Sequence, residues 1–174
     1  MIVSSSAGTW WAGALALSVV ALALRGIGPW SWVVAACGGA LAVAAPFATG
    51  ARLPSGVWWA ATIAGLPAFV IVRMLWSSPT RVTSLALVAA VVAAVGEEAL
   101  FRRGVYGFLE RWGAAVAVVG AALAFGLVHA PIYGWRVVPL DVGAGLVFGW
   151  QRWVTRRWSS PAVTHAVANV LAHV

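Results

Sequence analysis

The chain has 174 residues, of which 63% are hydrophobic and only 9% are charged, and its mean hydropathy is +0.95. A soluble globular domain has about a quarter of its residues charged, so this composition excludes that class and indicates a membrane protein. All eleven basic residues are arginines between apolar runs, and the net charge is +7. Arginines in this arrangement indicate membrane topology and contact with lipid headgroups, so we expect no nucleic-acid partner. The single cysteine, Cys37, excludes an internal disulfide and a multi-cysteine metal site.

The apolar runs predict an all-α, polytopic membrane helix bundle of about seven transmembrane helices, because a span needs about 20 apolar residues. In chain order the predicted spans are residues 10–24, 30–48, 57–76, 82–108, 113–130, 137–154 and 161–174. We expect a single membrane-embedded domain over residues 1–174. Its first part, residues 1–80, has no acid and no histidine and is expected to be scaffold, and residues 82–174 are expected to form the catalytic core.

Two of the four acidic residues in the chain, Glu97 and Glu98, are adjacent in the fourth run. Burying an ionised carboxylate costs several kcal/mol unless it is paired, so acids inside a span are functional candidates. Arg102 follows Glu98 by four residues, and on a helix these side chains share one face. Glu97 points about 100° away and faces a different neighbour. The plain alternative is a charged helix end at the membrane surface, paired with Arg102 and Arg103.

Two later runs each carry residues four apart, which share one helix face. Phe125 and His129 end the fifth run, and His165 and Asn169 lie in the seventh. Polar side chains in spans usually turn toward the protein interior, so we expect these to face the core. Asp141, early in the sixth run, is expected to be structural, pairing with an arginine or with the backbone.

A carboxylate, two imidazoles and an amide that converge form a hydrolytic set. A glutamate with a histidine can position and deprotonate a water molecule. A second histidine and an asparagine can donate hydrogen bonds to the oxyanion of a tetrahedral intermediate. Alternatively, Glu97, His129 and His165 would hold a zinc ion with a water in the open position. The sequence contains no His-Glu-x-x-His helix, so the best-known metalloprotease signature is absent.

The motifs of these three runs together resemble those of the CAAX protease and bacteriocin-processing family of intramembrane endopeptidases, which is related to the type II CAAX prenyl endopeptidase. In chain order they are Glu97-Glu98-x-x-x-Arg102, Phe125-x-x-x-His129 and His165-x-x-x-Asn169. Phe101 and Arg102 also fit the family's usual Glu-Glu-x-x-Phe-Arg-Gly form, with Arg103 standing where glycine is common. The resemblance covers about residues 82–174, and the first three runs match only in being hydrophobic.

The resemblance implies an all-helical membrane protease that cleaves a membrane-anchored protein or peptide near the membrane surface. The implied catalytic residues are Glu97, His129, His165 and Asn169, and the implied supporting residues are Glu98, Arg102 and Phe125. Glu97 with His129 would activate the water, and His165 with Asn169 would stabilise the oxyanion. A glutamate-dependent mechanism without a cofactor is favoured over zinc, because an asparagine four residues after His165 suits hydrogen bonding better than ligation.

The small size and the high content of Ala, Val, Arg and Trp suggest a prokaryotic source. We therefore expect a multi-pass integral protein of the inner (plasma) membrane, in contact with membrane lipids, and do not expect a prenylated substrate. Two other functions fit parts of the pattern: a non-catalytic binding or immunity protein with the same fold, and a proton-coupled carrier. The complete motif set favours the protease, and a carrier predicts internal repeats that are not evident.

Overall fold

The computed structural model describes residues 54–76 and 84–173, and all regular structure in these ranges is helical. In chain order the longer elements are α3 (Ser55–Trp76), α4 (Ser84–Glu98), a π-helical segment (Ala99–Val105), α5 (Tyr106–Leu109), α6 (Ala114–Tyr133), α7 (Val138–Thr155) and α8 (Ser159–His173). Their bounds agree within a few residues with the last five predicted runs. The all-α fold class is therefore confirmed for the described part. The predicted spans 10–24 and 30–48 lie outside the described residues.

Glycines set both ends of α6, and a proline starts α7. Gly113 precedes α6 with φ +109°, and Gly134 follows it with φ +83°. Residues other than glycine rarely adopt such positive φ values. Pro139 lies in the first turn of α7, where its missing N–H has no helical partner to lose. A single short turn, Trp135–Val137, separates the two helices, so the end of α6 and the start of α7 are neighbours.

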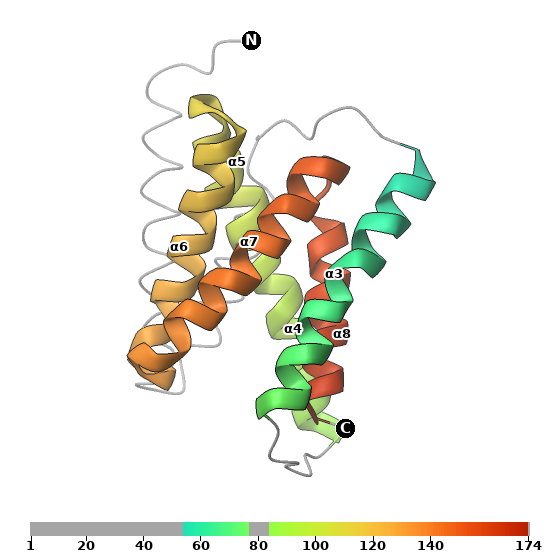
Figure 1. Cartoon of the computed structure of the whole chain (residues 1–174), viewed down its shortest axis with the longest axis vertical. Helices are drawn as coiled ribbons and strands as arrows, with labels where there is room; N and C mark the ends of the chain where they lie inside the picture. The colour runs from blue at the N-terminus through green and yellow to red at the C-terminus, as the bar shows by residue number, and fades with distance from the viewer. Residues whose placement is uncertain (1–53, 77–83, 174) are drawn as a thin grey trace.

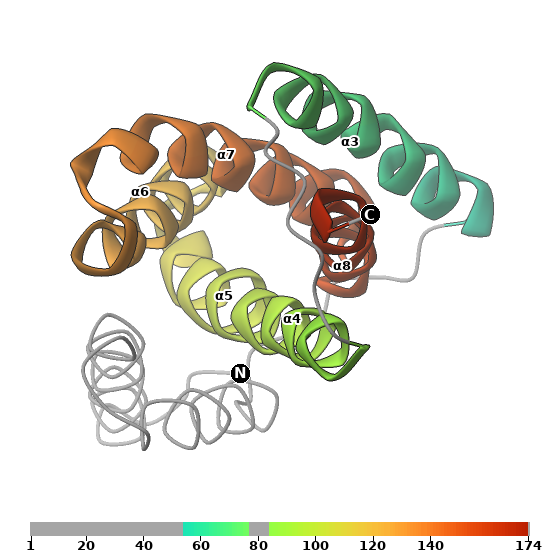
Figure 2. The same ribbon diagram turned by 90° about the horizontal axis from the view of Figure 1, so that it is seen from below.

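The helices pack so that α7 lies against α6, and α8 lies between α3 and α4 (Figures 1 and 2). Small residues allow the close approach of α6 and α7. A Cβ on Gly145 would lie 2.8 Å from Cα of Ala122, and a Cβ on Gly149 would lie 3.0 Å from Cγ1 of Val118. Close packing of backbones through small residues is typical of helix pairs in membranes.

The surface of α6 has the opposite pattern to that of a water-soluble helix. Ala117, Ala121 and Ala122 are fully buried, whereas Leu123 and Leu127 are about half exposed. Small residues inside and large apolar residues outside suit a helix whose outer face contacts lipid. By length and composition, α6 is the described helix that can cross a bilayer, and α3 adds a shorter apolar stretch, Ser55–Ile71.

The helical run that carries the two glutamates changes its pitch at the site. It continues from α4 into the π-helical segment and then into α5 without a break. The backbone N–H of Tyr106 donates to the carbonyl oxygen of Phe101, five residues earlier, as expected for a π-helix. Such segments often occur at functional sites. The segment also supplies Leu100 and Phe101 to the core, where they pack with Phe125 and Phe148.

Candidate active site

Glu98, the last residue of α4, forms a buried ion pair with Arg102. Its Oε2 lies 3.2 Å from Nε of Arg102, and both side chains are fully buried. The guanidinium also lies 5.2 Å from the ring centre of Phe125 and 5.5 Å from that of Phe148, and Nη1 donates to the carbonyl oxygen of Ala121. The buried cation is therefore compensated by one carboxylate, one carbonyl and two aromatic rings. The spacing of four residues predicted this pair.

The other oxygen of Glu98 holds His165 of α8. Oε1 lies 3.0 Å from Nδ1 of His165, and because an ionised carboxylate only accepts hydrogen bonds, Nδ1 carries the hydrogen. The imidazole stacks on Phe148, with ring centres 4.9 Å apart and planes inclined by 24°. Glu98 thus connects Arg102 on its own helical run to His165 on a different helix, and it fixes the orientation of that imidazole.

Glu97 faces the other predicted histidine, His129 of α6. Its Oε2 lies 3.8 Å from Nε2 of His129, and the two side chains are 7% and 8% exposed. This separation exceeds a direct hydrogen bond, and one water placed beside both atoms would lie within about 2.8 Å of each. Nδ1 of His129 lies 2.8 Å from the carbonyl oxygen of Phe125. Because a carbonyl only accepts, Nδ1 carries the hydrogen, and in the neutral ring Nε2 presents its lone pair toward Glu97.

Asp141 is a site residue that sequence reasoning did not assign. Its Oδ2 lies 3.6 Å from Nδ1 of His129, a contact that the sequence did not predict. The short turn at Gly134 is the feature of the sequence that could have placed Asp141 near His129. His129 lies shortly before this turn and Asp141 shortly after it, and two antiparallel helices joined by a short turn bring such positions together.

Asn169 lies one helical turn after His165 on α8. Its Nδ2 donates to the carbonyl oxygen of Ala90 in α4, at 3.1 Å. This bond joins the same two helices as the contact between Glu98 and His165, so α8 is attached to α4 by two polar contacts one turn apart.

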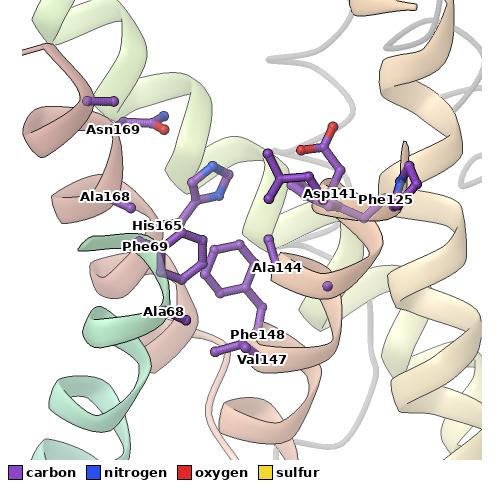
Figure 3. Close-up of a pocket in the computed structure, with 14 residues that line it drawn as sticks. Ala68, Phe69, Phe125, Asp141, Ala144, Val147, Phe148, His165, Ala168 and Asn169 are labelled. Atoms are coloured by element: carbon purple, nitrogen blue, oxygen red, sulfur yellow. The ribbon is translucent and has the colours of Figure 1, made fainter. Parts of the chain in front are cut away.

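A cavity of about 680 Å³ lies beside these residues, between α3, α6, α7 and α8. Its polar lining comes from His165, Asn169 and Asp141, and apolar side chains such as Phe69 and Phe148 form most of the rest. Figure 3 shows His165 and Asn169 projecting from α8, and Asp141 projecting from α7. The cavity is large enough for an extended stretch of apolar side chains, and it presents a few polar groups to that stretch.

Three of the predicted motif residues lie against the ring of Phe125. His129 packs edge-on against this ring with centres 4.8 Å apart, and His165 does so at 5.8 Å. Arg102 lies over the same ring. Side chains from α4, α6 and α8 and from the π-helical segment therefore form one cluster, although Glu97 and His129 do not line the cavity itself.

The donor atoms of the predicted site do not form a zinc site. Within residues 54–76 and 84–173, no three His, Cys, Asp or Glu side chains form a group that could hold a metal ion. Of the three predicted ligands, Glu97 and His129 face each other, whereas Nδ1 of His165 is bonded to Glu98. The arrangement does not fit a three-ligand site, and we derive no chemical step through a metal.

Glu110, the remaining acid, belongs to a separate cluster of charges. It pairs with Nη1 of Arg156 at 3.1 Å and with Nη2 of Arg152 at 3.7 Å, and its side chain is 29% exposed. Nε of Arg152 donates to the carbonyl oxygen of Arg102, which ties α7 to the π-helical segment. The cluster contacts neither motif histidine in the described structure, so Glu110 provides a matched control for the acids of the site.

Comparison with known proteins gave one family match, and no curated protein or solved structure matched. The model of the type II CAAX prenyl endopeptidase Rce1-like family matches residues 79–171, which is more than half of the 174-residue chain. The matched segment begins before α4, ends within α8 and contains all three motifs. This family is membrane-embedded, and membership implies protease activity in general terms. The chain belongs to the type II CAAX prenyl endopeptidase Rce1-like family.

Proposed function

We propose that the protein is an intramembrane endopeptidase that hydrolyses a peptide bond of a membrane-anchored protein or peptide, with Glu97 as its general base. The observation that carries this proposal is the separation of 3.8 Å between Oε2 of Glu97 and Nε2 of His129. Both atoms accept hydrogen bonds, and a water between them has two hydrogens to donate. A water held in this way keeps its oxygen lone pairs directed away from both residues, available for attack on a carbonyl carbon.

The proposed reaction has two steps. In the first, the water oxygen bonds to the scissile carbonyl carbon while Glu97 takes one water proton, and the carbonyl oxygen becomes an oxyanion. In the second, the carbon–nitrogen bond breaks and Glu97 gives the proton to the leaving nitrogen. The immediate products are a carboxylic acid and an amine. The acid then passes its proton to the amine, which gives a carboxylate and an ammonium, so atoms and charge balance. His129 accepts the second water hydrogen and fixes the water's position.

The oxyanion would be stabilised by His165 and Asn169, which both line the cavity. His165 keeps its Nδ1–H bond to Glu98, so it can donate through Nε2 only in its doubly protonated form. Oxyanion donors of this kind typically contribute 10²- to 10³-fold in rate. The mainly apolar cavity would hold the residues that flank the scissile bond.

The substrate is unknown, so the test must detect hydrolysis directly. Purified full-length protein in nanodiscs is incubated with a solubilised membrane-protein extract in H₂¹⁸O, and new C-termini are identified by mass spectrometry. Hydrolysis places one ¹⁸O in each new carboxylate. A farnesylated peptide ending in Cys-a-a-X serves as a defined second probe, because the family model is named for such substrates. We expect labelled termini with the wild-type protein.

Glu97→Gln should lower the cleavage rate by about 10³-fold, because general-base catalysis contributes about 10²- to 10⁴-fold. Its melting temperature should stay near that of the wild type. Glu110→Gln is the matched control, since it makes the same change in an acid outside the site, and it should cleave normally. Wild-type rates with Glu97→Gln would overturn the assignment of the base. A folded wild-type protein without labelled products would favour the binding-protein alternative. Activity that a chelator removes and Zn²⁺ restores would favour the zinc alternative.

A further inference from the structure

Asp141 is the acid among the described residues that lines the cavity, and it also contacts a motif histidine. Its Oδ2 lies 3.6 Å from Nδ1 of His129, on the side of the imidazole away from Glu97. The side chain is 24% exposed, compared with 8% for His129. The carboxylate therefore lies between the cavity and the histidine.

The imidazole of His129 is held on several sides. Nδ1 donates to the carbonyl oxygen of Phe125 at 2.8 Å, and the ring stacks on Tyr133 with centres 5.9 Å apart and planes inclined by 20°. The Phe125 carbonyl and the Asp141 carboxylate are both acceptors, so both favour hydrogen on Nδ1 and a lone pair on Nε2. The carbonyl comes from the same helix as His129. Asp141 comes from α7 and adds a negative charge.

Helix packing fixes the position of Asp141 relative to His129. Gly126, one turn before His129, faces α7 so closely that a Cβ there would lie 3.1 Å from the carbonyl oxygen of Val138. Gly145, one turn after Asp141, packs against Ala122 in the same way. Close contacts on both sides of the His129–Asp141 pair leave little freedom for α7 to slide along α6.

We propose that Asp141 is a positioning residue that acts through His129: its carboxylate holds the Nδ1–H side of the imidazole so that Nε2 faces Glu97 and the reacting water. The proposal rests on the proposed function, in which Glu97 and His129 hold that water. A carboxylate behind a catalytic imidazole fixes its tautomer and orientation and stabilises positive charge on the ring. Asp141 touches no reacting atom in this scheme.

The first measurement does not depend on activity. The full-length protein is labelled with ¹⁵N-histidine in nanodiscs, and the His129 signals are identified by their loss in His129→Gln. We expect wild-type His129 to show a downfield, slowly exchanging Nδ1–H proton signal. In Asp141→Asn this signal should shift upfield and exchange faster, while Glu110→Gln should leave it unchanged. An unchanged signal in Asp141→Asn would overturn the proposal.

The second measurement uses kinetics on a peptide made from the cleavage site found with the ¹⁸O label, or on the farnesylated peptide. At metal sites, loss of a residue that orients a histidine typically costs 10- to 100-fold, and we expect kcat of Asp141→Asn to fall by about that factor with little change in KM. Asp141→Glu keeps the charge and should recover part of the loss. A rise in KM at unchanged kcat would instead make Asp141 a substrate-binding residue and overturn the positioning role. If the wild-type protein cleaves nothing, the proposed function fails. The NMR result alone then shows whether Asp141 holds the Nδ1–H side of the His129 imidazole.

Discussion

The two motif histidines have opposite surroundings. His165 is fixed by a short chain of polar contacts, 3.0 Å to Glu98 and then 3.2 Å from the buried Glu98 to Arg102. His129 has longer contacts with its carboxylates, 3.8 Å to Glu97 and 3.6 Å to Asp141. A carboxylate already bonded to an arginine and an imidazole has little capacity left for a reactant. The gap between Glu97 and His129 is too long for a direct hydrogen bond, so it leaves room for a reactant such as water. Adjacent glutamates in the sequence can therefore serve different purposes.

The difference follows from the residues beside each glutamate. Glu98 shares its face with Arg102, and Phe125 and Phe148 exclude water from that pair. Glu97 faces α6 instead and has no arginine at the corresponding spacing, because residue 101 is Phe101. On this comparison, mutation of the buried pair of Glu98 and Arg102 behind His165 should act mainly through stability, and mutation of Glu97 and its contacts with His129 mainly through activity.

The largest stability effect is expected on the His165 side, for Arg102→Met. The substitution keeps an apolar stem of similar length and leaves Glu98 buried without its cation. Breaking a buried pair by removing one partner typically costs about 3–5 kcal/mol. We expect a large fall in melting temperature and in the yield of folded protein, measured by tryptophan fluorescence in detergent.

Arg156→Met is the matched control for that substitution. Arg156 also pairs with a glutamate, at 3.1 Å from Glu110, but its side chain is 43% exposed. Partly exposed pairs contribute only about 0–1 kcal/mol, so this variant should melt close to the wild type. Equal melting temperatures for Arg102→Met and Arg156→Met would mean that the buried chain of contacts is not what stabilises the His165 side.

A smaller stability effect is expected at the α6–α7 contact that positions His129 and Asp141. In Gly145→Ala the new Cβ would meet backbone atoms of Ala122 at 2.8 Å, and α7 would have to move. Overpacking of this kind costs about 1–3 kcal/mol. Because the shift separates Asp141 from His129, the Nδ1–H signal of His129 should change as it does in Asp141→Asn.

Gly143→Ala is the control on the same helix. A Cβ at Gly143 meets no atom within 4 Å, so this change should raise stability by about 0.5–1 kcal/mol through helix propensity. If Gly143→Ala and Gly145→Ala have the same effect on melting temperature and on the His129 signal, the close contact with Ala122 does not set the register of α7.

The sequence predicted what depends on local spacing. The helix bounds follow from the lengths of the apolar runs. The pairing of Glu98 with Arg102 and the shared face of His165 and Asn169 follow from helical periodicity, which acts over a few residues. The contact between Glu98 and His165 spans 67 residues and depends on how α4 packs against α8. Periodicity carries no information about such packing, so it could not assign the second partner of Glu98.

The remaining differences have similar causes. The π-helical segment Ala99–Val105 begins directly after Glu98, in a run without a proline. Asp141 could be placed near the end of α6 from the short turn, but which side chain it meets depends on rotation of α7 about its axis. The close contact of Gly145 with Ala122 sets that rotation, and only the structure shows it.

The smallest effect is expected where α8 contacts α3, on the side away from Glu98. Oγ1 of Thr62 lies 2.8 Å from Oγ of Ser160, and the backbone carbonyl of Thr62 accepts from Oγ1 of Thr164 at 3.1 Å. Thr62→Val keeps the backbone carbonyl and removes the hydroxyl, which contacts Ser160 and donates to the carbonyl oxygen of Trp58 at 2.7 Å, so it should cost about 1 kcal/mol.

Thr62→Val also tests whether α3 is scaffold, as the sequence predicts. His165 stays bonded to Glu98 from the α4 side in this variant, so kcat in the ¹⁸O-derived peptide assay should equal that of the wild type while the melting temperature falls slightly. A fall in kcat of tenfold or more would show that the contact with Glu98 of α4 is not sufficient to position His165. The position of His165 would then depend on the hydroxyl contacts of Thr62 in α3 as well as on Glu98.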